Sequence, residues 1–301
     1  MIINKSKYKN VFALELKTKY NSILVLPSEG GKIASFKSLT TGKEYMLQNP
    51  SPKFLHIGLK DSYVDGECCG FDDMFPTIDP VIIKRGEREV EYPDHGEVCR
   101  YPHQYDIIGQ NLVLTYNSTS LGYEFKKIYS ESVDGELQVR YEITNLSDFD
   151  LDAMWTAHCL VNAQKGGRVE LDALDGEPLD VMFDYSNQLK AGERVAFTKD
   201  SFVTDWDKKR IVKKFYFPYS TAGQRLSYRY LNGDRFCMEF DREVSCIGVW
   251  MNFGYFNDSY CVGLEPSTVG YDTVINAERY GKKRVIKPKQ TQSFSIKLIA
   301  K

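Results

Sequence analysis

The sequence predicts an all-β protein made of large antiparallel sheets, and three observations lead to this fold class. Apolar and polar residues alternate with a period of two in many short segments, as in strands that have one buried face. Turn-forming residues, mainly Gly, Asn and Asp, separate these segments. The 20 Tyr and 17 Phe residues also favour strands.

The alternation is clearest from Leu137 to Ile143, where four apolar residues lie two apart. Side chains two apart share one face of a strand, so the polar residues between them point the other way. The same reasoning predicts strands over 33–36, 112–116, 123–129, 226–231, 236–240, 246–250 and 293–298.

The pair Asn232-Gly233 predicts a β-hairpin between the segments 225–231 and 235–240. Asn-Gly favours a type I′ turn, because both central residues of that turn need a positive φ. A helix is harder to find. The segment 205–215 has an acidic start and a basic end that suit a helix dipole, but its apolar spacing is short. Helix and non-helix therefore stay open for this segment.

Composition indicates a globular protein with a core of its own, since 42% of residues are hydrophobic and 27% are charged. We expect a single domain over residues 1–301, because no linker, low-complexity tract or repeat interrupts the pattern. A boundary near residue 150 is the alternative.

Charge and hydropathy exclude several classes of partner. The net charge is −2 and basic residues are scattered among acidic ones, so we expect no nucleic acid. No stretch approaches the roughly 20 apolar residues that span a bilayer, and no apolar signal core opens the chain, so we expect a cytoplasmic protein without a membrane partner. The seven Cys residues form no Cys-x-x-Cys pair, which predicts reduced, buried thiols and no metal site.

The sequence contains no Gly-x-Gly-x-x-Gly, no phosphate-binding loop and no Gly-x-Ser-x-Gly motif. We therefore expect no cofactor, and chemistry must come from polar side chains. His titrates near neutral pH, and the four His residues differ in setting. His56 lies among apolar residues and receives no role, whereas His95 follows a Pro-Asp turn beside acidic residues. His103 either shares that site or packs beside it.

Two further residues stand at strand ends. His158 comes three residues after Trp155, and the two side chains point to opposite faces if that segment is extended. Glu265 follows an apolar strand and precedes a Pro that ends regular pairing. A carboxylate at a buried strand end is costly unless it has partners or a function.

Five stretches in this order resemble the aldose 1-epimerase, or galactose mutarotase-like, family from about residue 20 onward. They are Leu26-Pro-Ser-Glu-Gly-Gly-Lys-Ile-Ala-Ser-Phe with Thr41-Gly-Lys-Glu-Tyr, Gly70-Phe-Asp-Asp-Met-Phe-Pro, Pro93-Asp-His-Gly-Glu-Val, Tyr141-Glu-Ile-Thr-Asn through Trp155 and His158, and Gly263-Leu-Glu-Pro with Asn276-Ala and Lys287-Pro-Lys-Gln. The resemblance implies a β-supersandwich fold, a monosaccharide as substrate, and a monomer or homodimer.

In that family a late glutamate removes the proton of the anomeric hydroxyl while a histidine protonates the ring oxygen. By motif position these residues are Glu265 and His158, and His95 is the histidine that binds and polarises the sugar. The expected sugar-binding residues are Asp73, Asp72, Arg100, Trp155 and His103.

The chain also departs from the family pattern. Cys99 stands where many relatives have Trp, and the acidic sugar-binding residue of the middle of the chain has only Asp205 and Asp207 as candidates. A non-catalytic sugar-binding or sensing protein on the same fold is therefore the main alternative, ahead of a sugar lyase or hydrolase.

Overall fold

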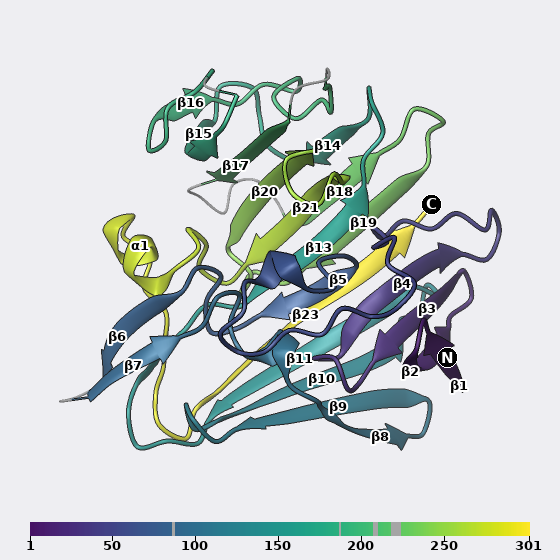
Figure 1. Ribbon diagram of the computed structural model, residues 1–301, viewed down its shortest axis with the longest axis vertical. Coiled ribbons are helices and arrows are strands. Elements are labelled where there is room, and N and C mark those ends of the chain that lie inside the picture. Colours follow the sequence, from purple (N-terminus) through teal and green to yellow (C-terminus); the bar gives the residue numbers. More distant parts are fainter. Residues whose placement is uncertain (86–87, 187, 207–209, 218–223) are drawn as a thin grey trace.

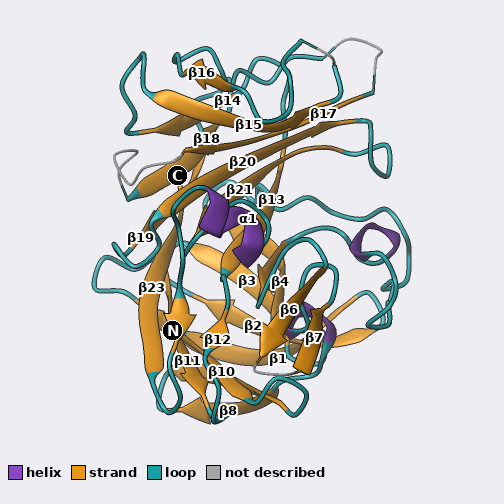
Figure 2. Cartoon of the chain, turned by 90° about the vertical axis from the view of Figure 1, so that its left-hand side faces the viewer, coloured by secondary structure: helices purple, strands orange, loops and turns teal. Residues whose placement is uncertain are grey.

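The structure is a computed structural model that describes residues 1–85, 88–186, 188–206, 210–217 and 224–301. Strands make up most of the chain and helix very little, as Figure 2 shows. In these residues, eleven strands form one antiparallel sheet, in the order β1 (Ile2–Tyr8), β2 (Val11–Lys17), β3 (Asn21–Leu26), β4 (Lys32–Ser38), β5 (Phe71–Met74), β13 (Thr156–Asn162), β21 (Tyr260–Ser267), β20 (Cys246–Phe253), β17 (Ile211–Phe217), β15 (Pro178–Asp184) and β16 (Arg194–Ala196).

A second antiparallel sheet packs against one face of the first. Over the same residues its order is β14 (Arg168–Leu171), β18 (Arg225–Arg229), β19 (Arg235–Phe240), β23 (Thr291–Ala300), β11 (Leu137–Asn145), β10 (Tyr123–Glu131), β9 (Asn111–Ser118) and β8 (Gln104–Ile108). Two small pairs accompany the large sheets, namely β6 (Val81–Arg85) with β7 (Arg88–Tyr92) and β12 (Leu151–Asp152) with β22 (Val285–Ile286). The helical elements are α1 (Val274–Arg279) and the 3-10 turns Tyr63–Asp65 and Val98–Arg100.

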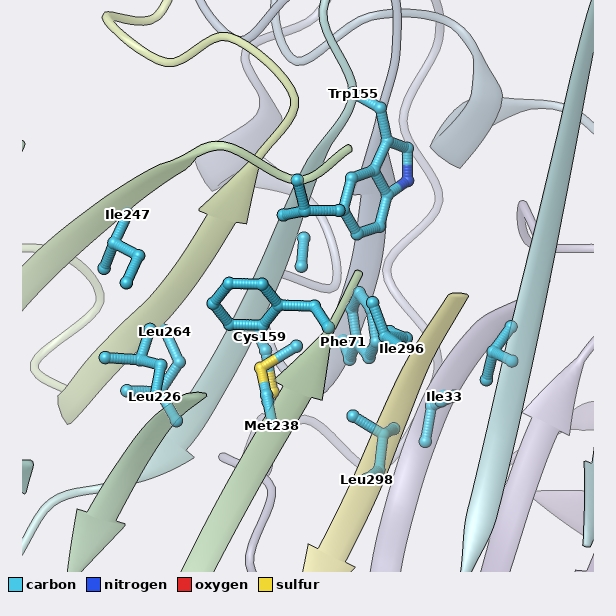
Figure 3. Packing of buried hydrophobic residues seen from close by; sticks show 14 of the residues in the cluster. Ile33, Phe71, Trp155, Cys159, Leu226, Met238, Ile247, Leu264, Ile296 and Leu298 are labelled. Carbon is cyan, nitrogen blue, oxygen red and sulfur yellow. The ribbon is translucent and has the colours of Figure 1, made fainter. Parts of the chain in front are cut away.

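The hydrophobic core lies between the two sheets. Figure 3 shows Phe71 and Leu264 of the larger sheet packed near Met238 and Leu298 of the second. The alternation predicted over 137–143 is confirmed, because Leu137, Val139, Tyr141 and Ile143 are all buried in this core. Burial of one face of each sheet is the main stabilisation, at about 25 cal/mol per Å² of apolar surface.

All seven further segments predicted as strands lie in or largely within strands, namely β4, β9, β10, β18, β19, β20 and β23. The predicted hairpin is confirmed too, since β18 pairs with β19 and Arg229 lies opposite Arg235. The turn type is wrong. Gly233 has φ +92°, but Asn232 is not in the positive-φ region. The Gly233 N–H donates to the Tyr230 carbonyl at 3.1 Å, which fits a type I turn closed by a left-handed Gly.

The helix considered for 205–215 is wrong where the structure describes the segment. Ile211 to Phe217 form strand β17, which pairs with β20 on one side and β15 on the other. Residues 207–209 lie outside the described residues.

The cysteines are free thiols, as predicted, and all except the partly buried Cys99 are buried. No helix in the described ranges is long and apolar enough to cross a membrane.

Candidate active site

Three adjacent central strands of the larger sheet, β5, β13 and β21, place polar side chains in one row. They come from distant parts of the chain and lie side by side (Figure 1). His158 of β13 pairs with Asp72 of β5. The pairs Thr156–Ser267 and Cys159–Leu264 keep one register, which puts Glu265 of β21 opposite His158 on the other side. Paired residues share a face, so these three side chains all point away from the core.

A cavity of about 320 Å³ opens on this outer face. Its polar lining is formed by His95, His158, Glu265, Lys214, Asp79 and Asp272. The apolar part of its wall includes Cys68, Ile78, Trp250 and Phe256. A cavity of similar volume, about 330 Å³, lies beside α1 and contains none of the predicted site residues. A concave site with convergent titratable groups is the arrangement that ligand-binding sites share, so we take the first cavity as the candidate active site.

His95 enters the cavity from a strained turn. Its φ of +58° lies in the left-handed region, which costs free energy for a residue other than Gly. The backbone N–H of His95 donates to the Ile78 carbonyl at 2.5 Å, and its Nδ1 lies 2.8 Å from Asp94 Oδ1. The imidazole stacks on Tyr63 at 4.2 Å. The ring is therefore held by Asp94 at Nδ1 and by Tyr63 on one face, and among the described residues no hydrogen-bond partner occupies Nε2, which is left for a ligand.

His158 is oriented by Tyr63. The Tyr63 hydroxyl donates to Asp72 Oδ2 at 2.5 Å and lies 3.5 Å from His158 Nδ1. Lys32 forms a buried ion pair with the same Asp72 carboxylate. Because its proton points to Asp72, the hydroxyl oxygen can accept from His158 Nδ1–H, which leaves Nε2 as the working nitrogen. Burial, followed by the nearby His95 and Lys214, lowers the pKa of His158 well below its usual value.

Glu265 is fully buried, and its charged partner is Lys214 of β17. The Lys214 ammonium lies 2.8 Å from Glu265 Oε2 and 2.6 Å from Asp272 Oδ1. Within the described residues, neither oxygen of Glu265 accepts a hydrogen bond of normal geometry, so the carboxylate is free to accept one from a ligand. Burial raises the pKa of Glu265, and Lys214 opposes that rise.

Two glycines give Glu265 its room in the sheet. A Cβ on Gly263 would lie 2.9 Å from Glu265 Oε1, and a Cβ on Gly248 would lie 3.2 Å from the Glu265 Cβ. A side chain at Gly263 would displace the Glu265 carboxylate, and one at Gly248 would press on Tyr216, 2.8 Å away, as well as on Glu265.

Asp72, Asp73 and Trp155, predicted to bind sugar, do not line the cavity. Asp72 is linked to the cavity through the hydroxyl of Tyr63, which donates to its carboxylate. Asp73 points to the opposite face of the sheet, where its carboxylate lies 2.5 Å from Lys127 Nζ and accepts a hydrogen bond from Trp155 Nε1 at 2.9 Å. Trp155 and His158 therefore face opposite sides, as an extended segment requires.

Arg100 and His103 also lie outside the cavity lining. Arg100 donates to the carbonyls of Asp94 at 2.7 Å and Gly58 at 2.5 Å, so it supports the turn that carries His95. His103 is buried, with Nε2 3.1 Å from the Val98 carbonyl, and burial lowers its pKa to about 3. Its imidazole therefore stays neutral and structural at physiological pH.

Asp73→Ala is expected to lower the free energy of unfolding by about 3–5 kcal/mol, because it leaves the Lys127 ammonium buried without its carboxylate partner. Urea denaturation followed by circular dichroism measures the change. Asp134→Ala, which removes an exposed carboxylate paired with Lys297, is the control and leaves the midpoint nearly unchanged. A similar small effect for Asp73→Ala would contradict a stabilising role for the buried pair.

The structure also adds residues that the sequence did not single out. Lys214, Tyr63, Asp79 and Asp272 line the cavity. Asp205, one of the two candidates for a mid-chain acid, instead pairs with Lys165 at the surface, and Asp207 lies outside the described residues.

The packed antiparallel sheets define a class of fold, that of galactose mutarotase-like proteins. A galactose mutarotase-like protein from Clostridium acetobutylicum is 15% identical with a TM-score of 0.70, covering 100% of this chain and 98% of the other. A galactose mutarotase related enzyme from Lactobacillus acidophilus is 14% identical with a TM-score of 0.66, over 95% and 97%. The aldose epimerase homologue from C. elegans is 10% identical with a TM-score of 0.66, over 100% and 99%. No family model and no curated protein matches the sequence.

Proposed function

We propose that the chain is an aldose 1-epimerase, which interconverts the α and β anomers of a sugar by acid and base catalysis of ring opening. One observation carries the proposal: Glu265, His158 and His95 line the same cavity. Each was predicted from a different stretch of sequence. The fold of the solved structures described above supports the same class of reaction.

Ring opening needs a base at the anomeric hydroxyl and an acid at the ring oxygen. Glu265 takes the proton of the hydroxyl, and His158 gives a proton from Nε2 to the ring oxygen. The bond between the anomeric carbon and the ring oxygen breaks, and the open aldehyde rotates. Reclosure on the other face returns both protons, and His95 hydrogen-bonds the sugar near the ring oxygen. The reaction needs no cofactor.

The electrostatics of the cavity suit this exchange. Burial raises the pKa of Glu265 and lowers that of His158, so both groups are shifted towards their neutral forms. The reactive state has an ionised Glu265 and a protonated His158, which the lowered pKa makes the minor form of the free enzyme at neutral pH. Ring opening converts it to a protonated Glu265 with a neutral His158. The raised pKa makes the ionised Glu265 a stronger base towards the anomeric hydroxyl, and the lowered pKa makes the protonated His158 a stronger acid towards the ring oxygen.

Polarimetry and NMR exchange on freshly dissolved α-glucose, α-galactose and other aldoses test the proposal. We expect the purified protein to accelerate mutarotation of at least one sugar. His158→Ala should lower that rate by about 10²–10⁴-fold, because the acid is lost. His56→Ala, which removes an exposed His paired with Glu29, is the matched control and should leave the rate unchanged. If no sugar reacts faster than in buffer, or if His158→Ala matches the wild type, the proposed mechanism is wrong.

The ion pair between Lys214 and Glu265 favours a second candidate, a protein that binds sugar without converting it. A base that stays neutralised by a lysine accepts a proton less readily. Saturable sugar binding by calorimetry, together with no acceleration of mutarotation, would support this alternative.

A further inference from the structure

A row of aromatic rings leads from the candidate active site to the protein surface. It starts at Trp250, whose ring lies 6.1 Å from the imidazole of His158. Phe256 follows at 6.1 Å from Trp250, Tyr255 at 4.9 Å from Phe256, and Tyr185 at 5.2 Å from Tyr255. We call these four residues the aromatic row. Trp250, Phe256 and Tyr185 line the cavity itself, so the row is continuous with the site.

The outer end of the row faces solvent. Tyr185 is 52% exposed and Tyr255 is 39% exposed, whereas Trp250 is only 8% exposed. Tyrosines that only filled a core would be covered by other side chains. An exposed ring that continues a binding cavity instead offers a flat apolar face with a hydroxyl in water, a combination common at binding sites.

The fold explains why the two tyrosines meet. Strand β17 lies antiparallel between β15 and β20. Strands β15 and β20 therefore run in the same direction, and their C-terminal ends lie at the same end of the sheet. Tyr185 directly follows β15, and Tyr255 follows β20. Residues after both strand ends therefore come together beside the cavity.

The loop that carries Tyr255 and Phe256 is held in place before any ligand binds. The buried Asn252 amide donates to the carbonyls of Phe256 at 3.0 Å and Ser259 at 2.9 Å, and its Oδ1 accepts from the Phe256 N–H at 2.9 Å. Asn257 donates to the Val64 carbonyl at 2.9 Å, which ties the loop to the turn that carries Tyr63. A fixed loop loses little conformational entropy on binding, so the row is preorganised.

We propose that the aromatic row binds the second ring of a reducing disaccharide, or of a longer sugar, whose reducing ring occupies the cavity. The proposal rests on the proposed function, because Glu265 and His158 define where the reducing ring lies. Sugar rings carry an apolar face of C–H groups that packs on aromatic rings, while their hydroxyls remain in water. The row begins next to His158 and ends at the surface, which is the direction a chain attached to the reducing ring must take.

The test compares glucose with cellobiose, maltose and lactose, which all have glucose as the reducing ring. In the wild type we expect a higher kcat/KM for at least one disaccharide than for glucose. Tyr185→Ala and Tyr255→Ala should each lower kcat/KM for that disaccharide about threefold to tenfold, mainly through KM, as expected for the loss of one stacking contact. Tyr255 does not line the cavity, so Tyr255→Ala should leave kcat/KM for glucose within about twofold. Tyr185 does line it, so Tyr185→Ala should lower kcat/KM for the disaccharide more than for glucose.

Matched variants separate ring stacking from general damage. Tyr185→Phe keeps the aromatic face and should keep the disaccharide rate. Tyr105, in strand β8 of the second sheet, is 39% exposed like Tyr255 and stacks on Phe12 at 5.9 Å. Tyr105→Ala should change kcat/KM for neither glucose nor the disaccharide. Equal losses for glucose and the disaccharide, or no loss for either, would overturn the proposal.

Binding measurements keep this inference separate from the proposed function. If the wild type converts no sugar, calorimetric titration still compares the dissociation constants of glucose and cellobiose, maltose or lactose. Tighter binding of a disaccharide that weakens in Tyr185→Ala would support the aromatic row even though epimerase activity had failed. Activity on glucose with no preference for any disaccharide, in rate or in binding, would overturn the row and leave the epimerase intact.

Discussion

Glu265→Gln is expected to lower kcat for mutarotation by about 10²–10⁴-fold, the usual contribution of a general base. Gln has nearly the shape of Glu, so the gap that Gly248 and Gly263 leave is still filled. An amide cannot take the proton of the anomeric hydroxyl, and it offers Lys214 no negative charge. Asp272 still pairs with Lys214 at 2.6 Å, which limits the effect on folding. Polarimetry at saturating sugar measures kcat, and thermal denaturation checks that the variant is folded.

Glu278→Gln is the matched control for this change. Glu278 lies on helix α1 with an exposed carboxylate near Lys283, outside the cavity that holds Glu265. We expect this variant to keep the wild-type rate. A folded Glu265→Gln protein with a rate within about twofold of wild type would exclude Glu265 as the general base.

Much of the fold could be predicted because each large sheet buries one face. Strands β10 and β11 alternate buried and partly exposed residues along nearly their whole length, and the sequence shows this as alternating apolar and polar residues.

Strand β17 was missed for a physical reason. Its outward-facing Lys214 is buried against Glu265 and Asp272, which follow 51 and 58 residues later in the chain. The segment therefore has a lysine where a buried strand should be apolar.

Some residues of the site could be predicted from the sequence, and others could not. His95, His158 and Glu265 were each singled out and line one cavity. Asp72 and Asp73 were not distinguishable, because all four residues of β5 are buried and neighbours in a strand point to opposite faces. Only the pairing of Asp72 with His158 decides which carboxylate faces outward. Tyr63 could not be found from sequence, since its role depends on Asp72 and His158 lying within reach of one hydroxyl.

Lys214→Met is expected to raise the pKa of Glu265 by about 1–3 pH units, because it removes the positive charge that favours the ionised carboxylate. Burial already raises the pKa of Glu265, and Lys214 is the main group that lowers it, while Asp272 raises it further and His95 lowers it. The lysine itself stays charged: burial opposes this, but Asp272 and Glu265 raise the pKa of Lys214. A ¹³C NMR titration of the labelled Glu carboxyls in the ligand-free protein measures the shift.

Asp272→Asn should move the same pKa in the opposite direction, because Asp272 is the anion that raises it. Asn tolerates the φ of +67° found at this position, and its amide oxygen can still accept from the Tyr216 hydroxyl, which lies 2.8 Å from Asp272 Oδ1. Lys213 is the neighbour of Lys214 in β17 but pairs with Asp184, so Lys213→Met should leave the pKa of Glu265 unchanged. A general loss of structure cannot shift the pKa of Glu265 in opposite directions in two variants and leave it unchanged in Lys213→Met. If Lys214→Met and Asp272→Asn shifted the pKa of Glu265 in the same direction, Lys214 would not be what keeps this base ionised.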